Sequence, residues 1–133
     1  MESPGWLERY RGGAREQVWH ELRQYGQQVR EPGLEAEAQS VCDEMARRAR
    51  HNVDVIVARL HEQGYRFHSN DDAQEPVEAL RPPGPHAGAL VPWLKDTFGD
   101  IPMVVSSWLR VVGDVCWSEP IRAGRSRRRL IRW

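Results

Sequence analysis

The fold is decided by residues 90–117, which read LVPWLKDTFGDIPMVVSSWLRVVGDVCW. Large apolar side chains recur every three or four positions in each half of this stretch, so each half predicts a short helix with one apolar face. Gly99 is predicted to end the first helix. Pro102 is predicted to lie in the first turn of the second, because proline has a preset φ and lacks only an N–H that would be unpaired there. Gly113 is predicted to end the second helix in the left-handed conformation, and residues 114–117 to begin a strand.

This succession of helix, turn, helix, glycine and strand resembles the opening of the SUKH superfamily, which includes a yeast regulator of cell-wall synthesis and many bacterial immunity proteins. The resemblance maps Phe98, Gly99, Ile101 and Pro102 onto the family's turn and Gly113 onto its glycine. It implies an α+β domain whose first strand follows that glycine. Residues 118–133 are all that remain for the other strands, so we expect the sheet to be truncated.

Residues 1–67 read as a helical module. Ser3-Pro4 predicts the start of a short helix, and two longer helices follow, from about Arg15 to Arg30 and from about Leu34 to Gln63. Their apolar stripes and the short break between them predict an antiparallel helical hairpin. We expect its core to contain Trp19, Leu22, Val53, Ile56 and Leu60, and the substitution Ile56→Ala to cost about 2 to 5 kcal/mol.

The chain therefore divides into four predicted parts, and its fold class is mainly α. The helical module of residues 1–67 is followed by residues 68–89, which contain four prolines and read as a linker. Residues 90–117 are the SUKH-like start. Residues 118–133 are an arginine-rich tail, whose unopposed positive charges are typical of a solvated segment.

Composition indicates a cytoplasmic protein of 133 residues, 40% of them hydrophobic. No run approaches the roughly 18 to 20 apolar residues of a membrane span, and the charged N-terminus is unlike a secretory signal. The two cysteines, Cys42 and Cys116, are too few for a disulfide framework and lack metal-site spacing, so we expect buried free thiols.

The net charge of zero hides an asymmetry between the tail and the rest of the chain. Residues 122–133 carry six of the 19 basic residues and no acid, which leaves 13 basic against 19 acidic residues elsewhere, a net charge of −6. Affinity for nucleic acid comes mainly from clustered Lys and Arg. An acidic body therefore argues against nucleic-acid binding, except through the tail.

The sequence contains no complete catalytic or metal-binding motif. His20 and His61 each precede a glutamate, as in zinc proteases, but Gln24 and Tyr65 stand where the second histidine ligand is required. No glycine-rich phosphate loop is present, and no histidine lies within residues 90–117 beside their candidate nucleophiles, which are Ser106, Ser107 and Cys116. We predict no enzymatic activity, no cofactor and no metal.

The function that this pattern predicts is binding of a protein partner. By resemblance to the SUKH superfamily, the partner is a toxin domain that an immunity-type protein neutralises by direct contact. The predicted contact residues are Asp96, Phe98, Asp100 and Asp114. Two alternatives stay open, a nucleic-acid-associated protein acting through the arginine-rich tail and a helical interaction domain of unassigned role. If the sheet is truncated, we expect Trp93, Phe98 or Trp108 to be exposed.

Overall fold

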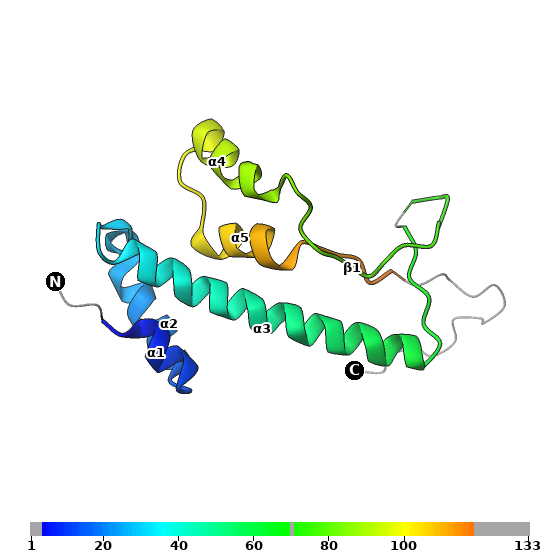
Figure 1. Cartoon of the computed structure of the whole chain (residues 1–133), viewed down its shortest axis with the longest axis horizontal. Coiled ribbons are helices and arrows are strands. Elements are labelled where there is room, and N and C mark those ends of the chain that lie inside the picture. Colours follow the sequence, from blue (N-terminus) through cyan, green and yellow to red (C-terminus); the bar gives the residue numbers. More distant parts are fainter. Residues whose placement is uncertain (1–3, 70, 119–133) are drawn as a thin grey trace, which may run out of the picture.

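The computed structural model describes residues 4–69 and 71–118, and these form a predominantly helical fold, as predicted (Figure 1). The calls on residues 119–133 lie outside the described residues. In the described part, no helix is both long and apolar enough to span a membrane. The elements in chain order are α1 (Trp6–Arg11), α2 (Arg15–Tyr25), the 3-10 helix η1 (Gly26–Arg30), α3 (Glu35–Glu62), β1 (Leu80–Arg81), α4 (Ala87–Phe98), α5 (Met103–Ser107), the π-helix η2 (Trp108–Val112) and β2 (Asp114–Val115).

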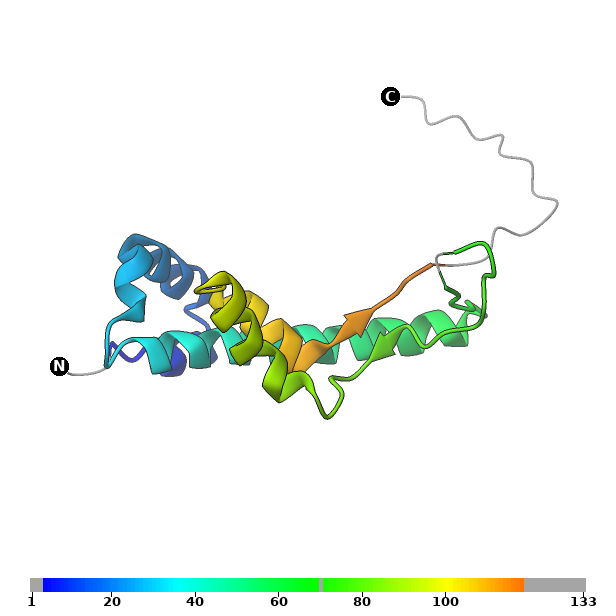
Figure 2. The same ribbon diagram turned by 90° about the horizontal axis from the view of Figure 1, so that it is seen from above.

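Helix α3 is the element on which the others are assembled. Its 28 residues extend over about 42 Å at 1.5 Å per residue. Helix α1 packs on its N-terminal half, and the α5–η2 segment packs along its middle. Figures 1 and 2 show that the two ends of α3 have different neighbours. The N-terminal helices gather at one end of α3, and the β1–β2 pair runs beside the other.

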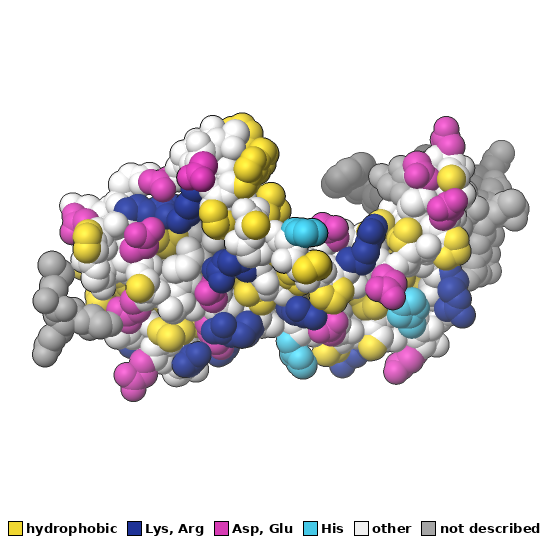
Figure 3. Space-filling view, turned by 45° about the horizontal axis from the view of Figure 1, so that its top comes forward, with side chains coloured by type: hydrophobic (Ala, Val, Ile, Leu, Met, Phe, Trp, Pro, Cys, Tyr) yellow, Lys and Arg dark blue, Asp and Glu magenta, His cyan; other side chains and the backbone are white. Residues whose placement is uncertain are grey.

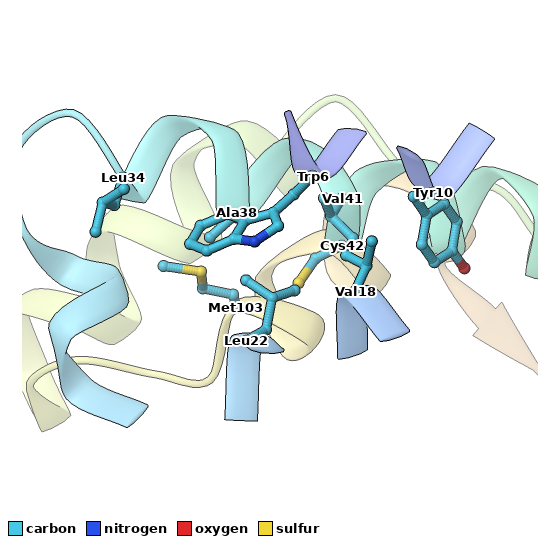
Figure 4. Close-up of a cluster of buried hydrophobic side chains, with 9 residues drawn as sticks. All are labelled: Trp6, Tyr10, Val18, Leu22, Leu34, Ala38, Val41, Cys42 and Met103. Carbon is cyan, nitrogen blue, oxygen red and sulfur yellow. The ribbon is translucent and has the colours of Figure 1, made fainter. Parts of the chain in front are cut away.

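One core joins the N-terminal helices to α5. Trp6 is fully buried at its centre, and Met103 of α5 lies in the same cluster as residues of α1, α2 and α3 (Figure 4). The two segments that the sequence separates, residues 1–67 and 90–117, thus share apolar contacts. The cluster consists of Trp6, Tyr10, Val18, Leu22, Leu34, Ala38, Val41, Cys42 and Met103.

The predicted hairpin is shorter than expected, because α2 ends at Tyr25 and not at Arg30. The α-helical hydrogen bonding stops at Gly26, and the five residues Gly26–Arg30 form η1. At 11 residues, α2 is only about 17 Å long, and its first residue, Arg15, lies beside the middle of α3. From there α2 runs back toward the start of α3.

The prediction that Ile56 lies in the core is therefore wrong. Ile56 is 40% exposed, Leu60 is half-buried, and of the predicted α3 core residues only Val53 is buried. Of the apolar stripe that the periodicity predicts on α3, Cys42 and Val53 are buried. In the described structure α2 does not extend over the second half of α3. We now expect Ile56→Ala to cost about 1 kcal/mol or less, since the side chain loses little buried area.

The turn between the two predicted helices of residues 90–117 is present. Helix α4 ends at Phe98 before Gly99, and α5 begins at Met103. Pro102 stands one position earlier than predicted, as the N-cap, with an extended ψ of 137°. Gly113 ends η2 with φ 86° and ψ −141°, so its φ is positive as predicted but its ψ is not left-handed helical.

The predicted strand after Gly113 is present and has a partner. Strand β2 pairs antiparallel with β1, with Leu80 opposite Val115 and Arg81 opposite Asp114. The partner comes from residues 68–89, which the sequence analysis interprets as a linker. That segment is anchored further by a hydrogen bond from the Cys116 backbone N–H to the Ala79 carbonyl, at 2.8 Å. A lone strand would leave its backbone groups unpaired, and the proline-rich segment supplies the partner.

Candidate functional site

The most distinctive surface of the described structure is apolar and lies on the outer side of the α4–α5 pair. Trp93 is 56% exposed and Phe98 is 71% exposed, although residues of this size usually lie mostly in the interior. Figure 3 shows apolar side chains gathered over α4. The expectation that Trp93, Phe98 or Trp108 is exposed is confirmed. We define the α4–α5 face as the exposed large apolar residues of α4, α5 and η2, which are Leu90, Trp93, Phe98, Val104, Val105 and Trp108.

This exposure follows from how the helix pair meets the rest of the chain. Met103, Ser107 and Val112 point toward α3 and are buried, so the opposite side of α5–η2 is left uncovered. Trp93 and Phe98 make an edge-to-face contact with ring centroids 6.1 Å apart, which holds the two exposed rings together. The two most exposed aromatic rings of α4 therefore lie against each other.

A groove of about 520 Å³ adjoins the α4–α5 face. It lies between residues 82–86, which we call the proline loop, the start of α4 and the end of η2. Leu90 and Trp93 line one side, and Leu109 lines another. Arg81 and His86 add polar side chains to this mostly apolar lining. A volume of this size accommodates one or two large side chains of a partner, within the range typical of binding sites.

The four predicted contact residues divide between two places. Asp96, Phe98 and Asp100 lie together at the end of α4 and in the turn that follows, and all three are exposed. Asp114 lies in β2 at the other end of the helix pair, where it lines the groove. No ion pair holds any of the three aspartates within the described residues.

Sequence reasoning missed the contribution of the proline loop to this site. Arg81, Pro82, Pro83 and His86 fall in the predicted linker, yet they form one wall of the groove. The available signal was the proline cluster directly before an apolar helix. The position of the proline loop against η2 depends on the β1–β2 pairing, which local sequence does not reveal.

A polar cluster connects the α5–η2 segment to α3. The Oδ1 atom of Asp43 accepts hydrogen bonds from Ser107 Oγ at 2.5 Å and from Arg110 Nη2 at 2.6 Å. Gln39 Nε2 donates to Ser107 Oγ at 2.8 Å and to the Met103 carbonyl at 3.1 Å. Ser107 is completely buried, and its hydroxyl donates a hydrogen bond to the Asp43 carboxylate. We call these hydrogen-bonded residues, Gln39, Asp43, Ser107 and Arg110, the Asp43 clasp, because they hold α5–η2 against α3. Since Ser107 is buried, it has no access to a substrate.

The Asp43 clasp makes stability depend on pH. Burial acts to raise the pKa of Asp43, but hydrogen bonds from Ser107, Arg110 and Gln39 outweigh it, so the pKa is lowered. A carboxylate with a lowered folded-state pKa stabilises the fold above its unfolded-state pKa, and that stabilisation is lost as the pH falls through the folded-state value. Asp43→Asn should lower the free energy of unfolding by about 1.5 to 3 kcal/mol at neutral pH.

Urea unfolding of both proteins at a series of pH values measures this effect. The difference in the free energy of unfolding between the parent and Asp43→Asn should be largest at neutral pH. It should shrink as the pH falls below about 4, the unfolded-state pKa of aspartate. The control is Asp54→Asn, because Asp54 is an exposed residue of the same helix with no ion pair in the described structure. If the difference in the free energy of unfolding between the parent and Asp43→Asn does not change with pH, the Asp43 charge does not stabilise the fold.

The remaining reactive groups are poorly placed for chemistry. Burial, with a smaller effect from Asp43, raises the pKa of the Cys42 thiol to about 11, so it remains protonated at neutral pH. Cys116 is half-buried, and its Sγ lies 3.5 Å from the His68 carbonyl oxygen. Within residues 4–69 and 71–118, no three His, Cys, Asp or Glu side chains are grouped so as to hold a metal ion.

Comparison with known proteins gives no match, since no family model, no curated protein and no solved structure is similar to this chain. The SUKH resemblance of residues 90–117 thus stays a prediction. The arguments for function rest on the geometry of the α4–α5 face and its groove.

Proposed function

We propose that this protein is a non-enzymatic binding module that presents the α4–α5 face to a polypeptide partner. The observation that carries the proposal is the exposure of Trp93, Phe98 and Trp108 on one helix pair beside an apolar groove. Aromatic residues are enriched at the energetically dominant positions of protein interfaces, because they bury a large area with few rotatable bonds. Several large apolar side chains exposed on neighbouring helices are typical of a binding site.

Charge around the α4–α5 face supports a particular kind of partner. Asp96 and Asp100 flank Phe98, with Lys95 as the one nearby base in that stretch of sequence. A partner segment with a large apolar side chain bordered by basic residues would match this pattern, because complementary charge orients the encounter and disfavours other partners. Asp114 offers a further acidic contact at the groove.

The SUKH resemblance suggests a narrower form of the proposal, in which the partner is a toxin domain neutralised by direct contact. That form is tested by gene order. A large secreted-toxin gene directly upstream would support it, whereas an unrelated neighbourhood would leave only the general proposal of polypeptide binding.

The double substitution Trp93→Ala/Phe98→Ala should weaken partner binding without unfolding the protein. Selection from a displayed library of random peptides should yield segments with an apolar anchor next to Lys or Arg. We expect the double variant to bind the selected peptides at least about tenfold more weakly, since truncating a dominant interface residue costs 2 kcal/mol or more. Isothermal titration calorimetry with a synthetic peptide measures the change.

The control for this experiment is Tyr65→Ala. Tyr65 is also an exposed aromatic residue, at 37%, but it follows the end of α3 and is not part of the α4–α5 face. This variant should bind like the parent protein. Failure to select any peptide, or equal loss in both variants, would contradict the proposal. A concentration-dependent increase in mass that the double variant lacks would identify the partner as a second copy of the chain.

A further inference from the structure

We propose that a second site, on the arginine side of α3, binds a phosphoryl group. The site is a cleft of about 580 Å³ between the start of α2 and the middle of α3. We define the arginine cleft by its lining, which is Arg15, Glu44, Arg47, Arg48, His51 and Asn52. None of these residues belongs to the α4–α5 face, so this proposal is independent of the proposed function.

The arginine cleft has a local excess of positive charge. Its lining contains three arginines against one carboxylate, a surplus of two charges. Arg11, at the end of α1, also lies within 3.5 Å of Glu44, which raises the surplus to three. The acidic net charge of the chain outside its tail conceals this surplus, because arginines distant in sequence meet only in the fold.

Glu44 orients two of these arginines. Its side chain is 14% exposed, and its two oxygens accept from Arg48 Nε at 3.0 Å and from Arg47 Nη2 at 3.0 Å. Hydrogen bonds from Arg48 and then Arg47 hold the pKa of Glu44 below its usual value, so it is ionised at neutral pH. Arg48 also lies over the ring of Tyr10, 5.4 Å from its centroid, which further restricts the guanidinium.

Many hydrogen-bond donors remain available after these contacts. A guanidinium has five N–H donors, and Arg48 uses only its Nε on Glu44. Within the described residues, the Arg15 side chain makes no ion pair and no hydrogen bond. The guanidinium of Arg48, which Glu44 holds in place, and that of Arg15 on α2 can donate to one anion from different directions.

A phosphoryl group is the ligand that fits these donors best. It carries up to two negative charges and three terminal oxygens, whereas a carboxylate offers one charge and two oxygens. Arginine matches phosphate geometry bidentately and is weakly hydrated, so it is favoured in phosphate sites. The phosphoryl group could belong to a free phosphorylated molecule or to a nucleic-acid backbone, and the experiment distinguishes these sources.

The test is a titration of the full-length, isotope-labelled protein with pyrophosphate at constant ionic strength, followed by NMR. We expect saturable shifts at Arg15, Arg47 and Arg48. The variant Arg15→Gln/Arg47→Gln should lose about tenfold or more in affinity, because two close charges and their donors are removed. Since residues 122–133 contain six arginines, the readout is site-specific shifts and not total binding.

A charge-matched variant, Arg59→Gln/Arg66→Gln, is the control. Both residues are exposed and lie outside the arginine cleft, so this variant should lose less than about twofold. Shifts caused by a single-stranded oligonucleotide but not by pyrophosphate would assign the phosphoryl group to a nucleic-acid backbone. The proposal fails if neither ligand gives saturable shifts, if both double variants lose equal affinity, or if acetate binds as tightly as pyrophosphate.

Discussion

Replacing Trp6 with alanine should lower the free energy of unfolding by about 3 to 5 kcal/mol, a large part of the total stability of a small domain. Trp6 is fully buried where α1, α2 and α3 meet. Its ring makes an edge-to-face contact with Tyr25 at 5.2 Å, and its Nε1 donates to Glu21 Oε2 at 3.1 Å. The substitution removes these contacts and leaves a cavity that the surrounding helices cannot fill completely.

The matched control is Trp93→Ala, which removes the same side chain from an exposed position. Trp93 is 56% exposed, its ring contacts Phe98, and it lines the groove. We therefore expect its replacement to lower the free energy of unfolding by about 1 kcal/mol or less. Guanidinium chloride unfolding, followed by far-UV circular dichroism, gives both values. Equal destabilisation by the two substitutions would contradict the core described here and would place Trp93 in a packed interior.

Replacing Gly113 with alanine should destabilise the fold by about 2 to 6 kcal/mol, as the sum of backbone strain and a steric clash. Gly113 has φ 86° and ψ −141°, a region adopted almost exclusively by glycine. An added Cβ would also collide with the Arg81 carbonyl oxygen and lie 3.0 Å from Pro82 C and Pro83 N. These are backbone atoms, so relief requires β1 and the proline loop to move away from η2.

Gly99→Ala separates the two contributions. Gly99 has nearly the same backbone conformation, with φ 84° and ψ −163°, but no atom lies within 4 Å of an added Cβ. This control should cost only the strain of about 1 to 3 kcal/mol. Thermal unfolding of both variants measures the difference. If Gly113→Ala is no worse than Gly99→Ala, the close approach of β1 to Gly113 is not present in solution.

The sequence by itself determined the local elements of this protein. The three- and four-residue spacing of apolar side chains located the helices, and Gly99 and Gly113 marked the ends of two of them. These predictions succeed because hydrogen bonding within a helix and the backbone preferences of glycine and proline are local properties.

Only the tertiary structure decided what covers each apolar stripe. Ile56 and Val53 follow the same periodicity on α3, yet Ile56 is exposed because α2 begins beside the middle of α3 and runs back toward its start. The partner of β2 comes from a proline-rich segment with no strand pattern, and the arginine cleft combines residues from two helices. Periodicity shows that a helix has an apolar face, but burial depends on contacts between residues distant in sequence, which local pattern does not contain.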